Sequence, residues 1–168
     1  MSSKPRIPRA TRRIALLGLL AMSGCGFAPV YGNDGSARVL RNAVAIDVPD
    51  TIAGFRMRAH LEDRLGHAST PRFQLTATLT QDDEAATITV DGDTTRFNLV
   101  GSSTWALTPV GAAEPVAKGK VQTFTSYAAT GSTVATQTAA RDARDRLSVA
   151  LADLIVARLI LATADLTP

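Results

Sequence analysis

The spacing of hydrophobic residues changes along the chain, and this change restricts the fold to a combination of helices and strands. Residues 51–65 place Met57, Leu61 and Leu65 four positions apart, which is typical of one buried helix face. In residues 72–80, hydrophobic residues alternate with polar ones, which is typical of a half-buried strand. Helical spacing returns over residues 134–162, where the expected buried stripe consists of Ala140, Ala143, Leu147, Leu151, Leu154 and Leu161.

The segment before the first helix is expected to form a strand. Residues 38–48 are rich in β-branched and apolar side chains, and Pro49 ends the run. Asp50 is the expected N-terminal cap of the helix, because its side-chain oxygen can accept from a free backbone N–H. Gly66 is the expected C-terminal stop, since glycine adopts the left-handed conformation without strain.

The segment after residue 80 is expected to contain two more strands. Residues 81–84 (QDDE) form a predicted polar break, and residues 87–90 form a short extension or a hairpin arm turned by an Asp-Gly pair. Longer strands are predicted over 95–108 and 116–127. Phe124 falls on the face opposite the other bulky residues of the last strand, which indicates a bulge or burial on both faces.

The predicted order is strand, helix, three strands and a long helix. This order favours an α+β fold, a two-layer sandwich in which about four strands form an antiparallel-rich sheet packed against two helices. The expected organisation is a signal segment over residues 1–24, a tether over residues 25–37 that is rich in Pro, Gly and Asn, and one α+β domain over residues 38–168.

The N-terminus has the three zones of an export signal. Residues 1–13 hold five basic residues and no acidic one, and residues 14–22 form an apolar run much shorter than the roughly 20 residues that span a bilayer. Small residues then precede Cys25, the only cysteine, in a pattern that resembles the bacterial lipobox. We therefore expect lipidation of Cys25 and cleavage before it; the alternative is an ordinary signal peptide with an incidental cysteine.

The route and destination of export follow from neighbouring residues. Arg12 and Arg13 resemble a twin-arginine signal, but Ala15 stands where that signal prefers a bulky residue, so general secretion is favoured and the alternative stays open. Gly26 replaces the Asp that is associated with inner-membrane retention, so outer-membrane sorting is expected.

Charge and residue types exclude several classes of function. The chain has a formal charge of +3, but beyond residue 24 it carries 13 basic and 15 acidic residues, so the exported part has no basic surplus for nucleic acid. A single cysteine excludes a multi-cysteine zinc site, and the acidic run 82–84 lacks the spacing of a calcium loop. No nucleophile–base motif occurs, and His60 and His67 are expected on the surface. We expect no enzyme activity, metal or cofactor.

Four basic residues lie on or beside the predicted strands, namely Arg72, Arg96, Lys118 and Lys120. If they converge, they could hold phosphate groups through charge-assisted hydrogen bonds. The alternative is scattered surface charge, and the sequence does not decide between the two.

Residues 25–32 read Cys-Gly-Phe-Ala-Pro-Val-Tyr-Gly, and this start resembles that of mature proteins in the lipopolysaccharide-assembly lipoprotein family, LptE. Val30 departs from the Leu that is usual there. Weaker matches follow in the same order over most of the chain, at residues 61–65, 72–79, 95–99, 119–120, 126–127 and the Ala-rich helix from residue 139.

The resemblance implies an outer-membrane lipoprotein on the periplasmic side. Family members plug the β-barrel translocon LptD, assist its assembly and are thought to bind lipopolysaccharide, without catalysis. Arg96 and Lys120 lie in the matching segments and are therefore the first candidates for lipid A phosphate contacts, followed by Arg72 and Lys118. The alternative function is a barrel-independent lipid-binding or ABC-transport auxiliary lipoprotein of the periplasm.

Overall fold

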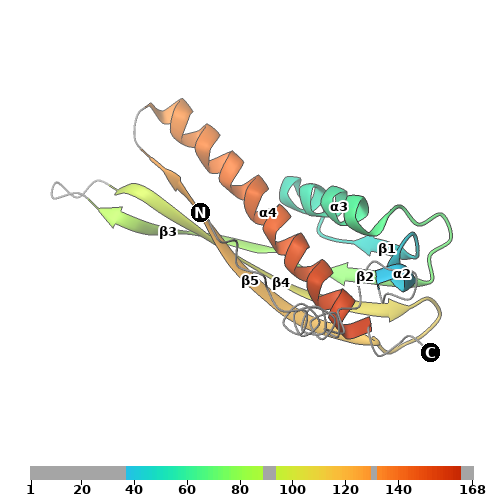
Figure 1. Cartoon of the computed structure of the whole chain (residues 1–168). Helices are drawn as coiled ribbons and strands as arrows, with labels where there is room; N and C mark the ends of the chain where they lie inside the picture. The colour runs from blue at the N-terminus through green and yellow to red at the C-terminus, as the bar shows by residue number, and fades with distance from the viewer. Residues whose placement is uncertain (1–36, 89–93, 130–131, 164–168) are drawn as a thin grey trace, which may run out of the picture.

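The computed structural model describes residues 37–88, 94–129 and 132–163. It forms two layers, a twisted sheet and a layer of helices on one of its faces, so the predicted α+β sandwich is confirmed (Figure 1). The elements in chain order are α2 (Ala37–Leu40), β1 (Val44–Asp47), α3 (Ile52–Leu65), β2 (Phe73–Ala77), β3 (Thr80–Ile88), β4 (Thr94–Pro109), β5 (Ala117–Ala128) and α4 (Thr133–Thr163).

Strand β4 organises the sheet because both of its edges are paired. One edge pairs with β5, and the other pairs with β3 over residues 94–102 and with β2 over residues 105–109, all antiparallel. Strands β2 and β3 therefore lie end to end. Thr78 bridges their junction, since its N–H donates to Thr104 O at 2.9 Å. The sheet thus has five strands but is four strands wide.

The first strand is shorter than predicted, and it is the one that pairs in parallel. Residues 37–40 form the short helix α2, whose Leu40 is buried, and only Val44–Asp47 is extended. Asn42 has φ 53°, a left-handed conformation that interrupts the segment between the two elements. Because α3 connects β1 to β2 across the sheet, these strands are parallel, and the sheet is mixed rather than purely antiparallel.

Helix α3 has the predicted buried stripe but a different N-terminal cap. Met57, Leu61 and Leu65 are buried. The cap is Thr51, not Asp50: Thr51 is extended and its Oγ1 accepts from Gly54 N–H at 3.0 Å. At the other end, Gly66 has φ 82° and its N–H donates to Glu62 O at 2.8 Å, as expected of a C-terminal stop.

The predicted polar break at residues 81–84 is wrong, because these residues belong to β3. Their side chains alternate as in any strand. Gln81 and Asp83 make hydrogen bonds to α4, whereas Asp82 and Glu84 are exposed. The inward-facing side chains of this part of β3 are polar and are satisfied by hydrogen bonds to α4. The alternation of apolar and polar residues that marks a strand in the sequence is therefore missing here. The predicted Asp-Gly turn at 91–92 lies outside the described residues.

Helix α4 lies diagonally over β4 and β5, and its buried stripe turns away from the predicted one near its end (Figure 1). Ala140, Ala143, Leu147 and Leu151 are buried as expected. Leu154 and Leu161, however, are 38% and 67% exposed. Ile155, Val156 and Leu159 fill the core instead. This end of the helix is apolar around most of its circumference, so its own pattern does not select the buried side.

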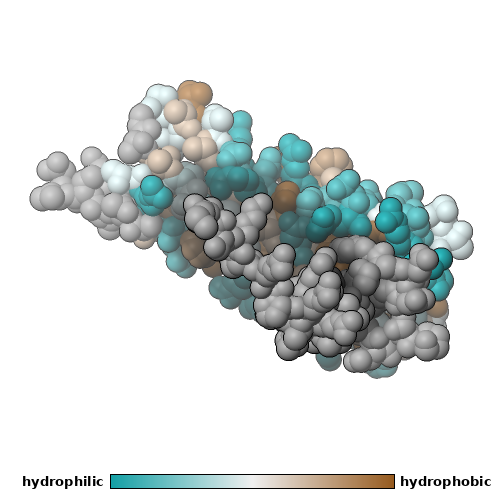
Figure 2. Space-filling view, viewed as in Figure 1, coloured by the Kyte–Doolittle hydropathy of each residue, from teal (hydrophilic) through white to brown (hydrophobic). Residues whose placement is uncertain are grey.

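Strand β5 pairs with β4 in one continuous register, without the bulge considered for Phe124. Phe124 lies on the face away from the helices and is 66% exposed, so burial on both faces is also wrong. In Figure 2 the visible surface around α3 is mostly hydrophilic, and hydrophobic residues stand beside hydrophilic ones at the beginning of α4. Within the described ranges, no helix combines the length and apolar character that crossing a membrane requires.

Candidate functional site

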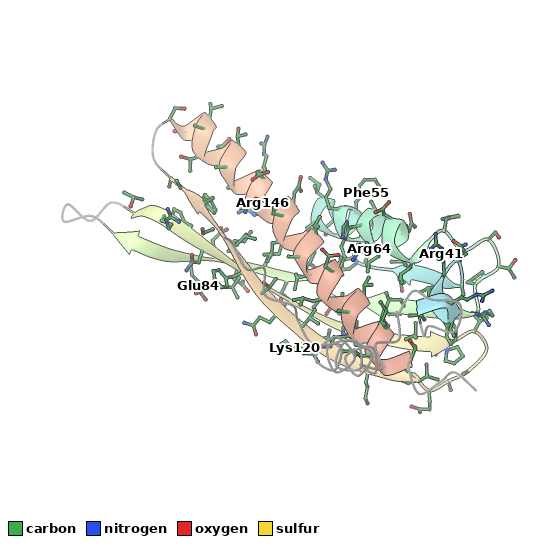
Figure 3. The ribbon with its side chains drawn as sticks, viewed as in Figure 1. Arg41, Phe55, Arg64, Glu84, Lys120 and Arg146 are labelled. Carbon is green, nitrogen blue, oxygen red and sulfur yellow. The ribbon has the colours of Figure 1, made fainter. Side chains whose placement is uncertain are left out.

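A basic groove lies where α4 ends beside the beginning of β5. It has a volume of about 550 Å³. Figure 3 shows Lys120 on β5 close to this end of the helix. Strand β4 contributes one lining residue, β5 three and α4 three, and together they are Trp105, Lys118, Gly119, Lys120, Arg158, Leu161 and Ala162. We call this surface the α4-end groove.

The floor of the α4-end groove depends on the register between β4 and β5. Trp105 pairs with Gly119, and a Cβ on Gly119 would lie 3.0–3.3 Å from the indole ring. Glycine therefore gives the large ring room against the neighbouring strand. The indole is 3% exposed, and its Nε1–H has no hydrogen-bond acceptor among the described residues. A buried donor without an acceptor is uncommon in folded proteins and calls for a reason.

The electrostatics of the groove are one-sided. Lys118, Lys120 and Arg158 line it, and none of the described residues that line it is acidic. The ion pairs between described Arg and acidic residues lie elsewhere, between α3 and α4, within α4, and between β3 and α4. Lys118 and Lys120 alternate with Gly119 along β5, so their side chains leave the sheet on the face away from the helices, whereas Trp105 and Arg158 lie on the helix side.

The structure brings together two of the four basic residues that the sequence singled out. Lys118 and Lys120 share the α4-end groove. Arg96 is exposed near the other end of β4. Arg96 pairs with Ala128 and Lys120 with Thr104, so about 27 Å of strand separates them at roughly 3.4 Å per residue.

Arg72 has contacts of its own at the start of β2. Its Nη2 donates to Val39 O at 2.7 Å, and its guanidinium lies 5.8 Å from the ring centroid of Phe73. It thus fastens α2 to the sheet. Arg158 and Trp105 also line the groove, but the sequence did not single them out as site residues. A lone Arg in the apolar run 154–161, and the only tryptophan of the chain, were the available signals.

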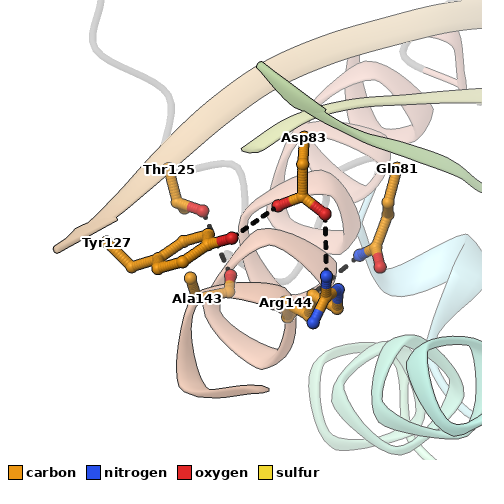
Figure 4. Close-up of polar contacts among 6 residues, drawn as sticks. All are labelled: Gln81, Asp83, Thr125, Tyr127, Ala143 and Arg144. Atoms are coloured by element: carbon orange, nitrogen blue, oxygen red, sulfur yellow. Dashed lines mark hydrogen bonds and ion pairs between the residues drawn. The ribbon is translucent and has the colours of Figure 1, made fainter. Parts of the chain in front are cut away.

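A polar network holds the other half of α4 to the sheet (Figure 4). Arg144 donates to Asp83 at 2.8 Å, and Tyr127 donates its O–H to the other carboxylate oxygen at 3.1 Å. Burial, followed by the hydrogen bond and the charge of Asp83, raises the pKa of Tyr127 above 10.0, while Arg144 acts in the opposite direction. Gln81 and Thr125 add hydrogen bonds to backbone oxygens of α4. These contacts are structural.

The sheet face opposite the helices is open in the described part of the chain. A shallow depression of about 430 Å³ lies on β4 and β5, next to the exposed ring of Phe124. Its lining residues are Asn98, Val100, Gln122, Thr123 and Phe124. Polar side chains thus stand beside the apolar surface of Val100 and Phe124 in this depression.

The described residues contain no recognisable catalytic arrangement. His60 Nε2 lies 2.9 Å from Asp153 Oδ1, so this histidine links α3 to α4 at the surface. No group of three or more potential metal ligands occurs within the described ranges. Cys25 and the predicted signal segment lie outside them.

Solved structures share this fold. A candidate lipoprotein from Caulobacter crescentus CB15 is 22% identical, with a TM-score of 0.64 over 79% of this chain and 98% of the other. Rare lipoprotein B from Shewanella oneidensis is 11% identical, with a TM-score of 0.59 over 74% and 98% of the two chains. A minor lipoprotein from Acinetobacter baumannii is 13% identical, with a TM-score of 0.52 over 71% and 91%.

Identity this low shows the fold alone, and no curated protein has a significantly similar sequence. The model of the LptE family, described as lipopolysaccharide-assembly, matches residues 41–159. This range includes every strand and α3, as well as most of α4. The match covers more than half of the sequence and confirms the resemblance seen in the motifs, so the chain belongs to the LptE family of lipopolysaccharide-assembly proteins.

Proposed function

We propose that this protein is an outer-membrane lipoprotein that plugs the LptD barrel translocon and assists its assembly, and so serves the insertion of lipopolysaccharide into the outer leaflet. The family match over residues 41–159 carries this proposal. A lipid on Cys25 would tether the domain to the periplasmic side of the membrane. Two or more acyl chains would make this anchor stable where a single chain is marginal.

The shape and surface of the domain support a role inside an aqueous lumen. Strand β4 has 16 residues and α4 has 31, so the domain extends about 54 Å along β4 and about 46 Å along the helix. The visible surface around α3 is mostly hydrophilic (Figure 2), and none of the described helices covers the opposite face of the sheet, where Arg96, Lys118 and Lys120 are exposed. An elongated domain that is polar on both faces fits a water-filled barrel better than a membrane surface.

Lipopolysaccharide contact is assigned to cations that remain available on the surface. Lys118 and Lys120 provide paired charges at one end of the sheet, and Arg96 provides a separate charge near the other end. Arg72 contributes less, because its guanidinium already contacts Val39 O and the ring of Phe73. The protein acts by binding and not by catalysis.

Co-purification tests the plug function. The full chain with a C-terminal tag is expressed in its native host and isolated from membranes in mild detergent. The expected result is a stoichiometric complex with a large outer-membrane β-barrel. A free lipoprotein that still binds lipopolysaccharide would refute the plug and support the barrel-independent carrier.

Lipidation of Cys25 needs its own test, because it does not depend on binding to the barrel. Metabolic labelling with radioactive palmitate should mark the wild-type chain and not the Cys25→Ser variant. Only the wild type should float with outer-membrane fractions in a density gradient. Equal labelling of both chains would refute lipidation at this residue.

A further inference from the structure

We propose that the free edge of β5 binds a short extended strand of a partner protein, and that this strand carries acidic side chains at alternate positions. Strand β5 (Ala117–Ala128) has 12 residues, and β4 is the only described strand that pairs with it. Its other edge has no partner strand in the described part of the chain. The inference goes beyond the proposed function and does not depend on it.

The register between β4 and β5 determines which backbone groups this edge presents. Ala129 follows the pair of Ala128 with Arg96, and it donates its N–H to Thr95 O at 2.9 Å. In an antiparallel ladder, such hydrogen-bonded pairs alternate with residues whose N–H and C=O point away from the neighbouring strand. The even-numbered residues of β5, from Lys118 to Ala128, therefore direct their N–H and C=O groups toward the free edge.

Both ends of this edge carry cations, and its middle is exposed. Arg146 on α4 reaches one end, where its Nη2 donates to Ser126 O at 3.4 Å. Lys118 and Lys120 lie toward the other end, and Figure 3 shows Arg146 and Lys120 in these two places. Cations on an edge strand oppose its pairing with a like-charged edge, such as β5 of a second copy. They leave the stretch that includes Phe124 open to a strand of opposite charge.

The middle of the β5 edge is also regular enough to accept a strand. Its pairing with β4 runs in one continuous register from Ala117 to Ala128. The edge strand β3, in contrast, shifts register twice between Ala85 and Ile88 and carries three acidic residues in a row. Bulges and runs of charge are the usual means by which an edge avoids pairing. Strand β5 has neither.

The charge of the partner strand follows from the side chains on β5. Lys118 and Lys120 are two positions apart, so they leave the same face of the sheet. In a strand added beside β5, the residues opposite them would have Cβ atoms about 5 Å from the lysine Cβ atoms. Opposite charges stabilise such cross-strand pairs, and like charges destabilise them. The partner strand is therefore acidic at the two positions that face these lysines.

Phe124 determines the other end of the partner strand. Its ring is 66% exposed on the same face as the two lysines, beside the depression of about 430 Å³ that Asn98 and Val100 also line. An apolar side chain opposite Phe124 would cover this ring. Antiparallel pairing is slightly more stable per residue than parallel pairing. The ligand is thus an extended segment that pairs antiparallel with residues 118–124, apolar at its first position and acidic at its last alternate ones.

Peptide binding to the full chain in a neutral detergent tests the proposal. The probe is the acetylated and amidated peptide Val-Thr-Thr-Thr-Glu-Thr-Glu, which places Val opposite Phe124 and the Glu residues opposite Lys120 and Lys118. Two comparison peptides carry Lys in place of both Glu, or Pro in place of the third residue. By fluorescence anisotropy, we expect saturable binding of the acidic peptide and about tenfold weaker binding of the other two. Equal binding of the acidic and the Lys peptide would overturn the proposal.

Hydrogen–deuterium exchange at single-residue resolution gives a signature that general charge attraction lacks. The bound acidic peptide should slow exchange of the N–H groups of Lys120, Gln122 and Phe124, whereas the odd-numbered residues between them are already protected by β4. Peptide binding without this alternation would overturn the strand. Slow exchange at the same groups without peptide, together with a dimeric mass in analytical ultracentrifugation, would assign the edge to a second copy and overturn the acidic partner.

Variants of Gln122 separate the backbone edge from its side chains. Gln122→Pro removes one outward N–H, and Gln122→Ala keeps it. Because this N–H does not belong to the β4–β5 ladder, an edge strand tolerates proline there, and thermal unfolding checks that both variants are folded. Gln122→Pro should raise the Kd of the acidic peptide about tenfold, and Gln122→Ala less than about twofold. Equal Kd values for the two variants would refute the edge as the binding site.

Charge variants test the role of the lysines. Combining Lys118→Gln with Lys120→Gln should bring the Kd values of the acidic and the Lys peptide to within about twofold of each other. Arg41→Gln removes a cation from an exposed position outside β5 and should keep the wild-type preference for the acidic peptide. A double variant that also keeps this preference would refute the acidic character of the partner.

Barrel co-purification keeps this inference separate from the proposed function. A barrel complex formed by a chain that does not bind the acidic peptide would refute only the strand site. Peptide binding without any barrel complex would refute only the plug. A lipid phosphate held by Lys118 and Lys120 and a strand at this edge would exclude each other, so the peptide titration is carried out without lipopolysaccharide.

Discussion

Gly101 on β4 sets how closely α4 can approach the sheet, and a single methyl group there tests the packing. An ideal Cβ on Gly101 would lie 2.8 Å from Leu147 Cδ2, 2.9 Å from Leu147 Cγ and 3.0 Å from Leu151 Cδ1. Both leucines are fully buried in the core. The methyl group of Gly101→Ala therefore has no free space, and the helix or both leucines must shift.

The magnitude follows from two opposing effects. Overpacking a tight core costs about 1–3 kcal/mol, whereas replacing Gly by Ala lowers the entropy of the unfolded chain and returns about 0.4–1 kcal/mol. Gly101→Ala should therefore lower the free energy of unfolding by about 1–2 kcal/mol. Leu147→Ala alone removes the buried side chain and should cost about 2–5 kcal/mol.

A double variant that combines Gly101→Ala with Leu147→Ala separates the packing effect from other effects on stability. With Leu147 shortened, the new methyl group occupies vacated space, so the double variant should be at least about 1 kcal/mol more stable than the sum of the single changes. Urea unfolding of the chain without residues 1–25, followed by circular dichroism, measures each term. Gln122→Ala, at an exposed position of β5, is the control and should stay within about 0.5 kcal/mol of wild type. A fully stable Gly101→Ala, or additive single changes, would refute the close approach.

Two further predictions concern polar contacts. Thr51→Ala removes the cap of α3 and should cost about 0.5–2 kcal/mol in the same urea assay, whereas Asp50→Ala should be nearly neutral; the reverse order would restore Asp50 as the cap. Because the pKa of Tyr127 is raised on folding, its contribution to stability is present below pH 10.0 and is lost as pH rises through the higher folded pKa. Asp83→Asn should lower that pKa in an ultraviolet titration, and an unchanged titration would show that the hydrogen bond is absent.

Local sequence patterns predicted a helix or strand well where only one of its faces is buried. The four-residue spacing of Met57, Leu61 and Leu65 and the left-handed Gly66 located α3 to within one residue. The long strand and the long helix were also found close to their observed bounds. In each case, short-range geometry and a single buried face suffice.

The misses occur where partners distant in sequence decide the outcome. The polar neighbours of Asp83 in the sequence predict a loop. In the structure, Tyr127 and Arg144 donate hydrogen bonds to its carboxylate, so the residue is accommodated in a strand. Leu161 looks like a core residue, but α4 diverges from the predicted stripe and leaves it exposed beside the groove. A hydropathy pattern does not specify how α4 crosses the sheet, nor that β3 pairs with β4.

The sequence by itself determined the two main helices and the strands β2, β4 and β5 in their correct order, the lack of a recognisable catalytic motif and, through the motif that begins at Cys25, the resemblance to the LptE family. These features are local, because residue spacing and short motifs carry them. Only the tertiary structure decided that α4 ends beside the beginning of β5, that Trp105 packs against Gly119, and that Arg96 lies far from Lys120. The physical reason is that strand register and helix crossing, which depend on contacts between distant segments, set the distances between these groups.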